Sequence, residues 1–354
     1  MYIVKNYLLF SLRALFISMA MLLSLSMQAA QIEIDGINYD LDGKTKQATV
    51  IAKSSGKYSG KVVIPESVEF KGTVCSVTSI GEYSFYDCYK LTSVTIPNSV
   101  KSIGDYAFQS CSGLTSVTIP NSVKSIGIGV FSYCSGLTSV TIPNSVESIG
   151  GIAFRFCSAL TSVTIGNSVK SIGIGAFSSC SNLVSVTIPN SVTSIGDGAF
   201  ESCSSLTSVT IPNSVTSIGY MGFYGCSRLM SVTIGNSVKS IGEYAFLECS
   251  SLTSVTIPDC VTSIGGYAFS HCSGLKSVTI PNSVTSIGEG AFWKCTEIID
   301  VYCYAEKPPY TNRGVFYESM IDFATLHVPA ASVESYKAAK PWSGFGKIVA
   351  ITKN

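Results

Sequence analysis

Residues 91–113 read LTSVTIPNSVKSIGDYAFQSCSG, and this 23-residue unit occurs nine times in succession, with few changes, up to residue 297. A fixed period of this length indicates a solenoid, in which each unit packs mainly against its neighbours. One unit could not fold alone, because ordering 23 residues costs roughly 1 to 2 kcal/mol each. Burying its seven apolar side chains contributes only of the order of 10 to 20 kcal/mol. The repeat therefore predicts an elongated stack of mutually stabilising coils.

The first six residues of the unit predict a strand, because they are rich in β-branched side chains. Their alternation turns Val94 and Ile96 inward, and Ser93 and Thr95 outward. The PNS tripeptide that follows favours a turn, Gly104 permits a bend, and AFxxC has helical or tight-turn character. The expected fold is an α/β repeat solenoid with one short parallel β-strand per 23-residue repeat, about 4.8 Å from the next, and a helical or turn-like return.

The first 30 residues have the layout of a secretory signal peptide. Lys5 and Arg13 precede an apolar stretch at 14–25, and small residues follow as far as Ala30. A retained membrane anchor is the alternative, but twelve helical residues rise only about 18 Å and do not span a bilayer core. We therefore expect export, to the cell surface, the periplasm or the medium, with no membrane span after signal cleavage.

The pattern divides the chain into four parts. These are a signal peptide at 1–30, an N-terminal cap with a degenerate repeat at 31–90, nine repeats at 91–297, and a degenerate repeat with a C-terminal cap at 298–354. Caps are expected because a bare end coil would expose the core and an open sheet edge.

Charge argues against binding to nucleic acid. Only 13 % of residues are charged and the formal net charge is +1. Removing residues 1–30 leaves 21 basic and 22 acidic groups. Without a basic run to neutralise phosphates, neither nucleic acid nor an anionic membrane is an expected partner.

The pattern LxxVxIPxxVxxIGxxAFxxC, found at 91–111 and in the eight units that follow, resembles the leucine-rich repeat in its BspA-like bacterial form. Residues 325–351 also look like the closing segment of such proteins. The resemblance implies an exported or surface-displayed, non-enzymatic protein of host-associated anaerobic bacteria. It further implies adhesion, with host matrix proteins, bacterial surface proteins or glycans as partners.

Ten of the thirteen cysteines recur at the repeat period, from Cys88 to Cys295. Disulfides are one interpretation for an exported chain. Cysteines in adjacent coils would lie about 4.8 Å apart, however, which is poor geometry for a disulfide. We therefore expect buried free thiols that act as small apolar fillers. Cys75, Cys260 and Cys303 lie outside this phase.

Neither a catalytic site nor a metal or cofactor site is expected. A triad or a metal site needs several groups that converge at one point, whereas this surface is copied nine times. The carboxylates are scattered singly, without the pair that a glycosidase uses. The only histidines, His271 and His327, are interpreted as surface or packing residues.

Two surfaces are candidates for binding. The outward serines and threonines of the strands form a nearly uniform array, which either solubilises the sheet or holds a repetitive partner through many weak contacts. The variable positions around AF carry aromatic residues and an arginine, which either fill gaps between turns or form a protein contact patch. The candidate residues are Tyr106, Tyr133, Arg155, Phe156, Tyr220, Tyr224, Tyr244, Tyr267 and Trp293.

The leading functional hypothesis is a non-enzymatic scaffold that binds proteins or glycans. A passive spacer protein without a ligand is the main alternative, and a hydrolase is a remote one. The Ser-x-Thr columns also resemble the flat hydroxyl arrays of ice-binding solenoids, an idea that thermal hysteresis would test.

Overall fold

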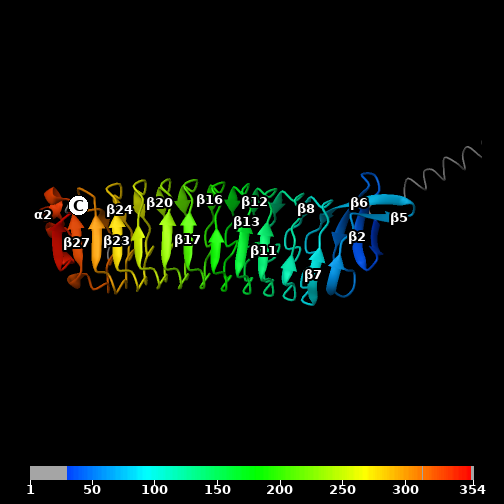
Figure 1. Ribbon diagram of the computed structural model, residues 1–354, viewed down its shortest axis with the longest axis horizontal. Helices are drawn as coiled ribbons and strands as arrows, with labels where there is room; N and C mark the ends of the chain where they lie inside the picture. Colours follow the sequence, from blue (N-terminus) through cyan, green and yellow to red (C-terminus); the bar gives the residue numbers. More distant parts are fainter. Residues whose placement is uncertain (1–29, 313, 352–354) are drawn as a thin grey trace, which may run out of the picture.

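Coils follow one another along one axis in the computed structural model, which describes residues 30–312 and 314–351 (Figure 1). The cap at one end is built from β-strands, and the cap at the other contains short helices. The predicted signal peptide lies outside the described residues, apart from Ala30, where strand β1 begins.

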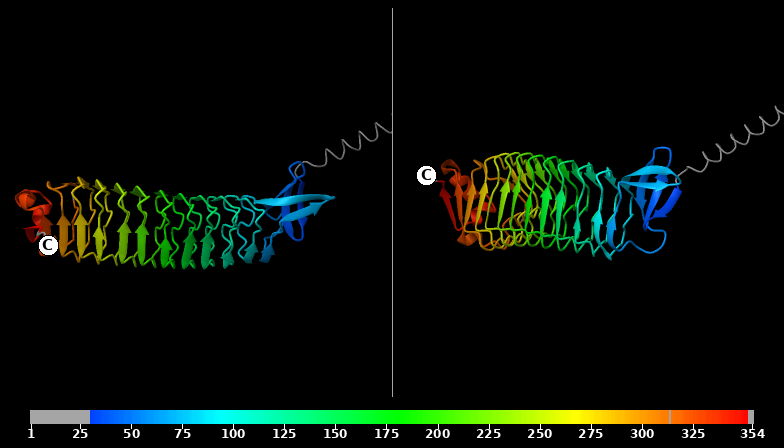
Figure 2. Two further views of the ribbon diagram at one scale, coloured as in Figure 1. Left: turned by 45° about the horizontal axis from the view of Figure 1, so that its top comes forward. Right: turned by 45° about the vertical axis from the view of Figure 1, so that its right-hand side comes forward.

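Each coil contributes a first strand that begins near its leucine, and these strands pair in parallel (Figure 2). The pairing is in register, so that Ser139 lies beside Ser162 and Thr141 beside Thr164. Identical side chains therefore form columns, as the repeat predicts. The first series comprises β4 (Gly60–Val63), β7 (Leu91–Thr95), β9 (Ser116–Val117), β11 (Ser139–Ile142), β13 (Ser162–Ile165), β15 (Ser185–Thr187), β17 (Ser208–Ile211), β19 (Ser231–Ile234), β21 (Ser254–Thr256), β23 (Ser277–Ile280), β25 (Asp300–Cys303), β27 (Thr325–Val328) and β28 (Lys347–Ala350).

A second, two-residue strand follows the PNS corner, so the prediction of one strand per repeat is wrong. Its isoleucine points into the core and its serine outward. These strands also pair in parallel, as Ser125 with Ser148. The second series comprises β8 (Ser102–Ile103), β10 (Ser125–Ile126), β12 (Ser148–Ile149), β14 (Ser171–Ile172), β16 (Ser194–Ile195), β18 (Ser217–Ile218), β20 (Ser240–Ile241), β22 (Ser263–Ile264), β24 (Ser286–Ile287) and β26 (Tyr310–Thr311).

The return to the next coil is a chain of tight turns, so the predicted helical alternative is wrong and the turn-like one holds. The N–H groups of Tyr106, Phe108 and Ser110 donate to carbonyls of the following coil over 2.8 to 2.9 Å. The N–H groups between them close turns within their own coil. An α-helix would use every N–H internally. The only α-helix among the described residues is α2 (Val333–Ala338), in the C-terminal cap.

The N-terminal cap is a sheet in the order β1-β2-β3-β6-β5. Strand β6 of this sheet pairs with β8, the first strand of the second series. Strand β4, which precedes β5 in the chain, pairs with β7 in the first series. Both strand series therefore begin at this cap. Unlike the strands of the repeat, β1 pairs with β2 and β2 pairs with β3 in antiparallel fashion. The strands of this cap are β1 (Ala30–Ile34), β2 (Ile37–Asp42), β3 (Gln47–Ile51), β5 (Ser67–Phe70) and β6 (Thr73–Ile80).

The C-terminal cap continues the first series through β27 and β28 and covers the last coil with helices. Trp342 and Phe345 meet the ring of Phe316 edge-on, at centroid distances of 5.6 and 5.2 Å. Both rings close the end of the core. Besides α2, the helical segments of this cap are the 3₁₀ turns η1 (Ile321–Phe323), η2 (Ala330–Ser332) and η3 (Trp342–Gly344).

A column of stacked phenylalanines runs through the core from Phe85 to Phe316. Successive rings lie 4.7 to 5.5 Å apart and within 16° of parallel. Glycine follows the second strand of each coil from β8 to β24 and lets the coils approach this closely. A Cβ atom at Gly196 would lie 2.6 Å from the backbone nitrogen of Ile174, a contact that side chains do not tolerate.

The periodic cysteines lie beside this column and are free thiols, as the spacing predicts. From Cys111 onward, each thiol donates to the carbonyl of the phenylalanine 26 residues earlier over 3.1 to 3.3 Å. Burial raises the pKa of Cys180, Cys226 and Cys272 to about 12. The column therefore holds protonated, inert thiols at neutral pH.

Thiol labelling tests this arrangement. Cys260 is exposed, and the other twelve cysteines are buried. The folded protein should react rapidly with a thiol reagent at one cysteine per chain, and the Cys260→Ser variant should lose that reaction. Unfolding in denaturant should release all thirteen thiols. Fast labelling of several cysteines in the folded state would contradict the buried column.

Candidate functional site

The return segments of successive coils form one continuous surface, which we call the turn face. In each coil it comprises the six residues between the glycine after the second strand and the buried cysteine, as at 105–110. All nine candidate residues predicted from the sequence lie on the turn face, and all are partly or fully exposed. The structure therefore places them on one surface but gathers only some of them into clusters.

Two of the six turn-face positions have left-handed backbone conformation in every repeat. One precedes the Ala-Phe pair and the other precedes the cysteine, as at Tyr106 (φ 56°) and Ser110 (φ 61°). A side chain in this conformation costs about 1 to 2 kcal/mol. Other coils place glycine at the first position, as at Gly129 and Gly198. The coil therefore needs no side chain at this position, and the backbone conformation does not account for the tyrosines found there.

Four of the candidates form a C-terminal aromatic cluster, which we define as Tyr220, Tyr244, Tyr267 and Trp293. Tyr244 stacks on Tyr267 at 5.3 Å, and Tyr220 and Trp293 meet this pair edge-on at 5.5 and 6.1 Å. Tyr267 donates a hydrogen bond to the Glu289 carboxylate at 3.0 Å, which raises the pKa of the tyrosine. The cluster is a partly exposed aromatic patch that spans four coils.

Sequence reasoning missed some neighbours of this cluster. The ring of His271 lies 5.1 Å from that of Trp293, and Tyr317 lies 6.3 Å from it on the other side. Lys294 places its ammonium group 5.1 Å from the centre of the indole. Aligning the units by period would have found Lys294 and His271, because both occupy the repeat position of the candidates Tyr133 and Phe156.

The remaining aromatic candidates lie in smaller groups. Tyr133 stacks on Phe156 at 4.8 Å, and the Arg155 guanidinium lies 5.1 Å from the centre of the Phe156 ring. Tyr106 stacks at 5.2 Å on Tyr83, which the sequence analysis did not select although it occupies the same position one repeat earlier.

Tyr224 lies apart from these groups and lines an open trough of about 480 Å³, formed by the edge of the turn face and the serines that follow the buried cysteines. Phe156 lines one end of the trough, and serines of the intervening coils form its floor. Burial raises the pKa of Tyr224, with smaller contributions from the carboxylates of Glu248 and Glu201. This trough was not predicted, because its lining comes from five different coils.

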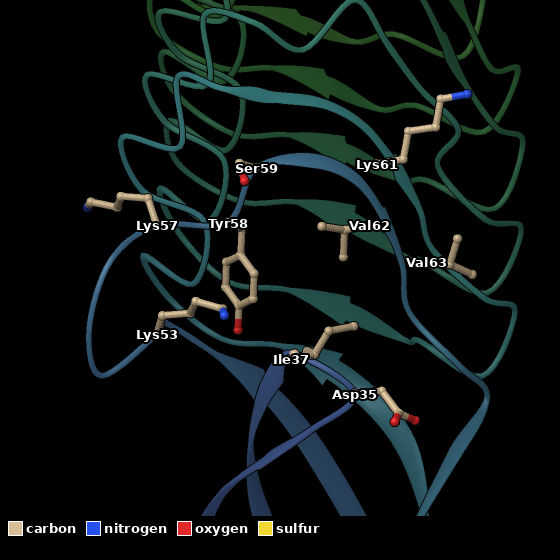
Figure 3. Close-up of a pocket in the computed structure, with 10 residues that line it drawn as sticks. Asp35, Ile37, Lys53, Lys57, Tyr58, Ser59, Lys61, Val62 and Val63 are labelled. Carbon is tan, nitrogen blue, oxygen red and sulfur yellow. The ribbon is translucent and has the colours of Figure 1, made fainter.

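A second hollow, of about 240 Å³, lies where the N-terminal cap meets the first coil (Figure 3). Three lysines surround it, but they do not converge. Lys57 and Lys61 point away from the space in Figure 3, and the ammonium group of Lys57 donates to the Tyr86 carbonyl at 2.8 Å. Lys53 pairs with Glu33 at 3.7 Å. The hollow is therefore a gap between the N-terminal cap and the first coil, not an anion site.

Tyr58 connects the N-terminal cap to the first coil beside this hollow. Its hydroxyl accepts the N–H of Asn38 at 2.9 Å and donates to the carbonyl of Ile51 at 2.7 Å. Its ring packs 4.5 Å from Phe85, the first ring of the phenylalanine column. Burial raises the pKa of Tyr58 to about 12. The phenol therefore stays neutral and joins the cap to the core.

No catalytic constellation is found among residues 30–312 and 314–351. His327 pairs with Asp300 at 2.8 Å on the outward sheet face, and His271 pairs with Ser270 at 2.8 Å. Neither pair includes the third group of a triad. Within the same residues, no three potential ligands gather to hold a metal ion, and no helix is long and apolar enough to cross a membrane.

The strand face also has a structural use. Threonines that follow the leucine donate hydroxyl hydrogen bonds to the carbonyl of the preceding coil, as Thr138 does to Thr115 at 3.3 Å. The outward Ser and Thr columns next to them are exposed along the repeat. Part of the hydroxyl array therefore holds the coils together.

Comparison with known proteins identifies the family. Residues 66–184 and 170–299 match the model described as the BspA type leucine rich repeat region, in six copies. The chain belongs to the BspA-type leucine-rich repeat family. No functionally curated protein matches the chain.

Solved structures of bacterial leucine-rich repeat proteins resemble this BspA-type chain. A leucine-rich cell surface protein from Faecalibacterium prausnitzii A2-165 is 28% identical, with a TM-score of 0.59, over 93% of this chain and 97% of that one. A leucine-rich repeat protein from Bacteroides ovatus is also 28% identical, with a TM-score of 0.45, over 91% and 100% of the two chains. The first of these two proteins is described as a cell surface protein.

The variant Tyr58→Phe should loosen the N-terminal cap. It keeps the ring but leaves the Asn38 N–H and the Ile51 carbonyl without their partner, at a cost of about 1 to 3 kcal/mol. Hydrogen exchange should accelerate in β2 and β3 while the central repeats stay protected. The control Tyr89→Phe changes an exposed phenol and should have no effect. Unchanged exchange in β2 and β3 would refute the role of Tyr58.

The variant Tyr244→Gly should leave stability nearly unchanged. Glycine removes about 1 to 2 kcal/mol of backbone strain and forfeits about 0.5 to 1.5 kcal/mol of ring stacking. Urea unfolding should give a change in free energy within about 1 kcal/mol, against about 3 to 5 kcal/mol for the neighbouring core variant Phe246→Ala. A loss for Tyr244→Gly as large as that for Phe246→Ala would show that the tyrosine serves the fold.

Proposed function

We propose that this chain is an exported, non-enzymatic scaffold that binds partner proteins at the bacterial surface. Export is supported by the signal-like residues 1–30 and by the relative described as a cell surface protein. Adhesion to host matrix or bacterial surface proteins is the role that the family resemblance suggests. The contact patch of this proposal is the C-terminal aromatic cluster.

The observation that carries the proposal is the placement of tyrosines in strained backbone where the fold accepts glycine. Tyr244 and Tyr267 have φ values of 58° and 55°, and Gly290 occupies the same position in the next coil. Partly exposed aromatic rings on a rigid frame lose little entropy on binding and are enriched at the centres of protein interfaces. Binding therefore accounts for rings that the coil does not need.

Low surface charge is consistent with such a contact. The chain carries few charged residues. Two of them contact the cluster: Glu289 accepts a hydrogen bond from Tyr267, and the Lys294 ammonium group lies over the Trp293 ring. This composition suits contact through apolar and hydrogen-bonding area more than electrostatic steering. The alternative of a passive spacer assigns no role to the exposed rings.

Binding of the immobilised protein to a panel of purified extracellular matrix proteins and bacterial surface proteins tests the proposal. At least one should bind with micromolar or tighter affinity. The triple variant Tyr244→Gly, Tyr267→Gly and Trp293→Ser uses residues that other coils carry at these positions, and should weaken that binding at least tenfold. The control Tyr106→Gly, at the other end of the turn face, should bind as the wild type does.

Two outcomes would contradict the proposal. If no matrix or bacterial surface protein binds, the spacer alternative is favoured. If a protein binds equally well to the wild type and to the folded triple variant, the aromatic cluster is not the contact patch and the strand face becomes the next surface to test.

A further inference from the structure

The trough beside Tyr224 is a second place where the surface side chains differ from one coil to the next. It extends from the coil of Phe156 to that of Glu248, four coil steps or about 19 Å. Between these ends, the residue before the cysteine has a small side chain or none: it is Ser179, then Ser202, then Gly225. In the flanking coils the same position carries larger side chains, so the hollow is bounded along the stack.

The floor of the trough presents side-chain hydroxyls instead of backbone groups. The N–H groups of Ser179 and Ser202 are already used, because they donate to carbonyls of the next coil at 2.7 and 2.6 Å. A peptide could not add here as a further strand, since strand addition needs free backbone donors and acceptors. A ligand would meet a double row of serine hydroxyls, which both donate and accept hydrogen bonds.

The charge of the lining argues against an anionic ligand. No lysine or arginine lines the trough, whereas Glu248 does. Glu201 contributes another carboxylate nearby, within hydrogen-bond distance of the Ser178 hydroxyl at 3.2 Å. Phosphate, sulfate or uronate groups in the middle of the trough would therefore be repelled by these carboxylates, and the Arg155 guanidinium is engaged over the Phe156 ring at one end. The lining suits a neutral ligand rich in hydroxyl groups.

Aromatic rings mark the two ends of the hydroxyl floor. Phe156 lines one end and is held there by its stack on Tyr133 and by the Arg155 guanidinium. Tyr224 lines the other end, beside Glu248. Ring faces pack against the C–H faces of sugars, while hydroxyls and a carboxylate bond to sugar hydroxyls. A few fixed polar groups between apolar walls are typical of ligand sites.

We infer that this trough is a binding site for a neutral oligosaccharide. Tyr224 would stack against a sugar ring at one end, the exposed edge of Phe156 would bound the other end, and Ser179, Ser202 and Glu248 would bond to hydroxyls between them. The site uses none of the four side chains of the C-terminal aromatic cluster, although the coils of Tyr220 and Tyr244 contribute to both. It can therefore be present whether or not that cluster binds a protein.

Isothermal titration with neutral hexasaccharides of glucose, mannose, xylose and galactose tests the inference. At least one should bind the full protein with a dissociation constant of about 1 mM or tighter. Ser202→Tyr should fill the floor, and the column tolerates this change because Tyr133 occupies the same position with the same backbone conformation. Phe156→Ser should remove one end wall. Each variant should weaken binding at least tenfold.

The matched control is Ser110→Tyr, which makes the same change in the same column but outside the trough. It should bind the hexasaccharide as the wild type does. Thermal unfolding of all three variants confirms that they are folded.

Four outcomes would overturn the inference. The first three are no binding of any hexasaccharide to the wild type, binding that both trough variants retain, and equal weakening by the Ser110→Tyr control. The fourth is preferential binding of an extended peptide in the trough, which would replace the sugar with another ligand class. The triple variant of the aromatic cluster should leave hexasaccharide binding unchanged. Failure of the oligosaccharide site can therefore be distinguished from failure of the protein contact patch.

Discussion

The structure depends on hydrogen bonds that run along the stack from every second N–H of the return. The N–H of Phe200 donates to the carbonyl of Gly222 in the next coil at 3.0 Å, while its neighbours close turns within their own coil. This alternation forces left-handed backbone at two positions per repeat and prevents a helix. It also sets the coil spacing at which phenylalanine rings stack and glycine is required after the second strand. No coil satisfies its backbone without a neighbour.

The same constraint explains where function can reside. Identical coils give columns of identical side chains, so every segment of such a column offers a ligand the same contacts. Sites therefore arise where successive coils differ at the four variable positions of the turn face. Rings at Tyr244 and Tyr267 build an aromatic patch, whereas small residues at Ser202 and Gly225 leave a trough. Both use positions that the fold leaves free, so binding can change without changing the core.

Much of the fold could be predicted from the period and from the alternation of Val94 and Ile96, because burial of one strand face is a local property. The second strand was missed because Ser102–Ile103 is too short to show alternation. The helical return was a wrong alternative because Ala107, Phe108 and Cys111 have the spacing of one helical face, while the bonds that exclude a helix join different coils. The trough could not be read from one unit for the same reason. The binding role of the nine predicted surface residues remains a prediction.

Hydrogen exchange of the folded Phe200→Ala variant tests most directly whether neighbouring coils hold one another. Phe200 stacks at 5.5 Å on Phe177 and at 5.4 Å on Phe223. Mutual stabilisation predicts a loss of about 3 to 5 kcal/mol that appears as faster exchange in the coils on both sides. Faster exchange confined to the coil of residue 200, with the adjacent coils as protected as in the wild type, would contradict this account.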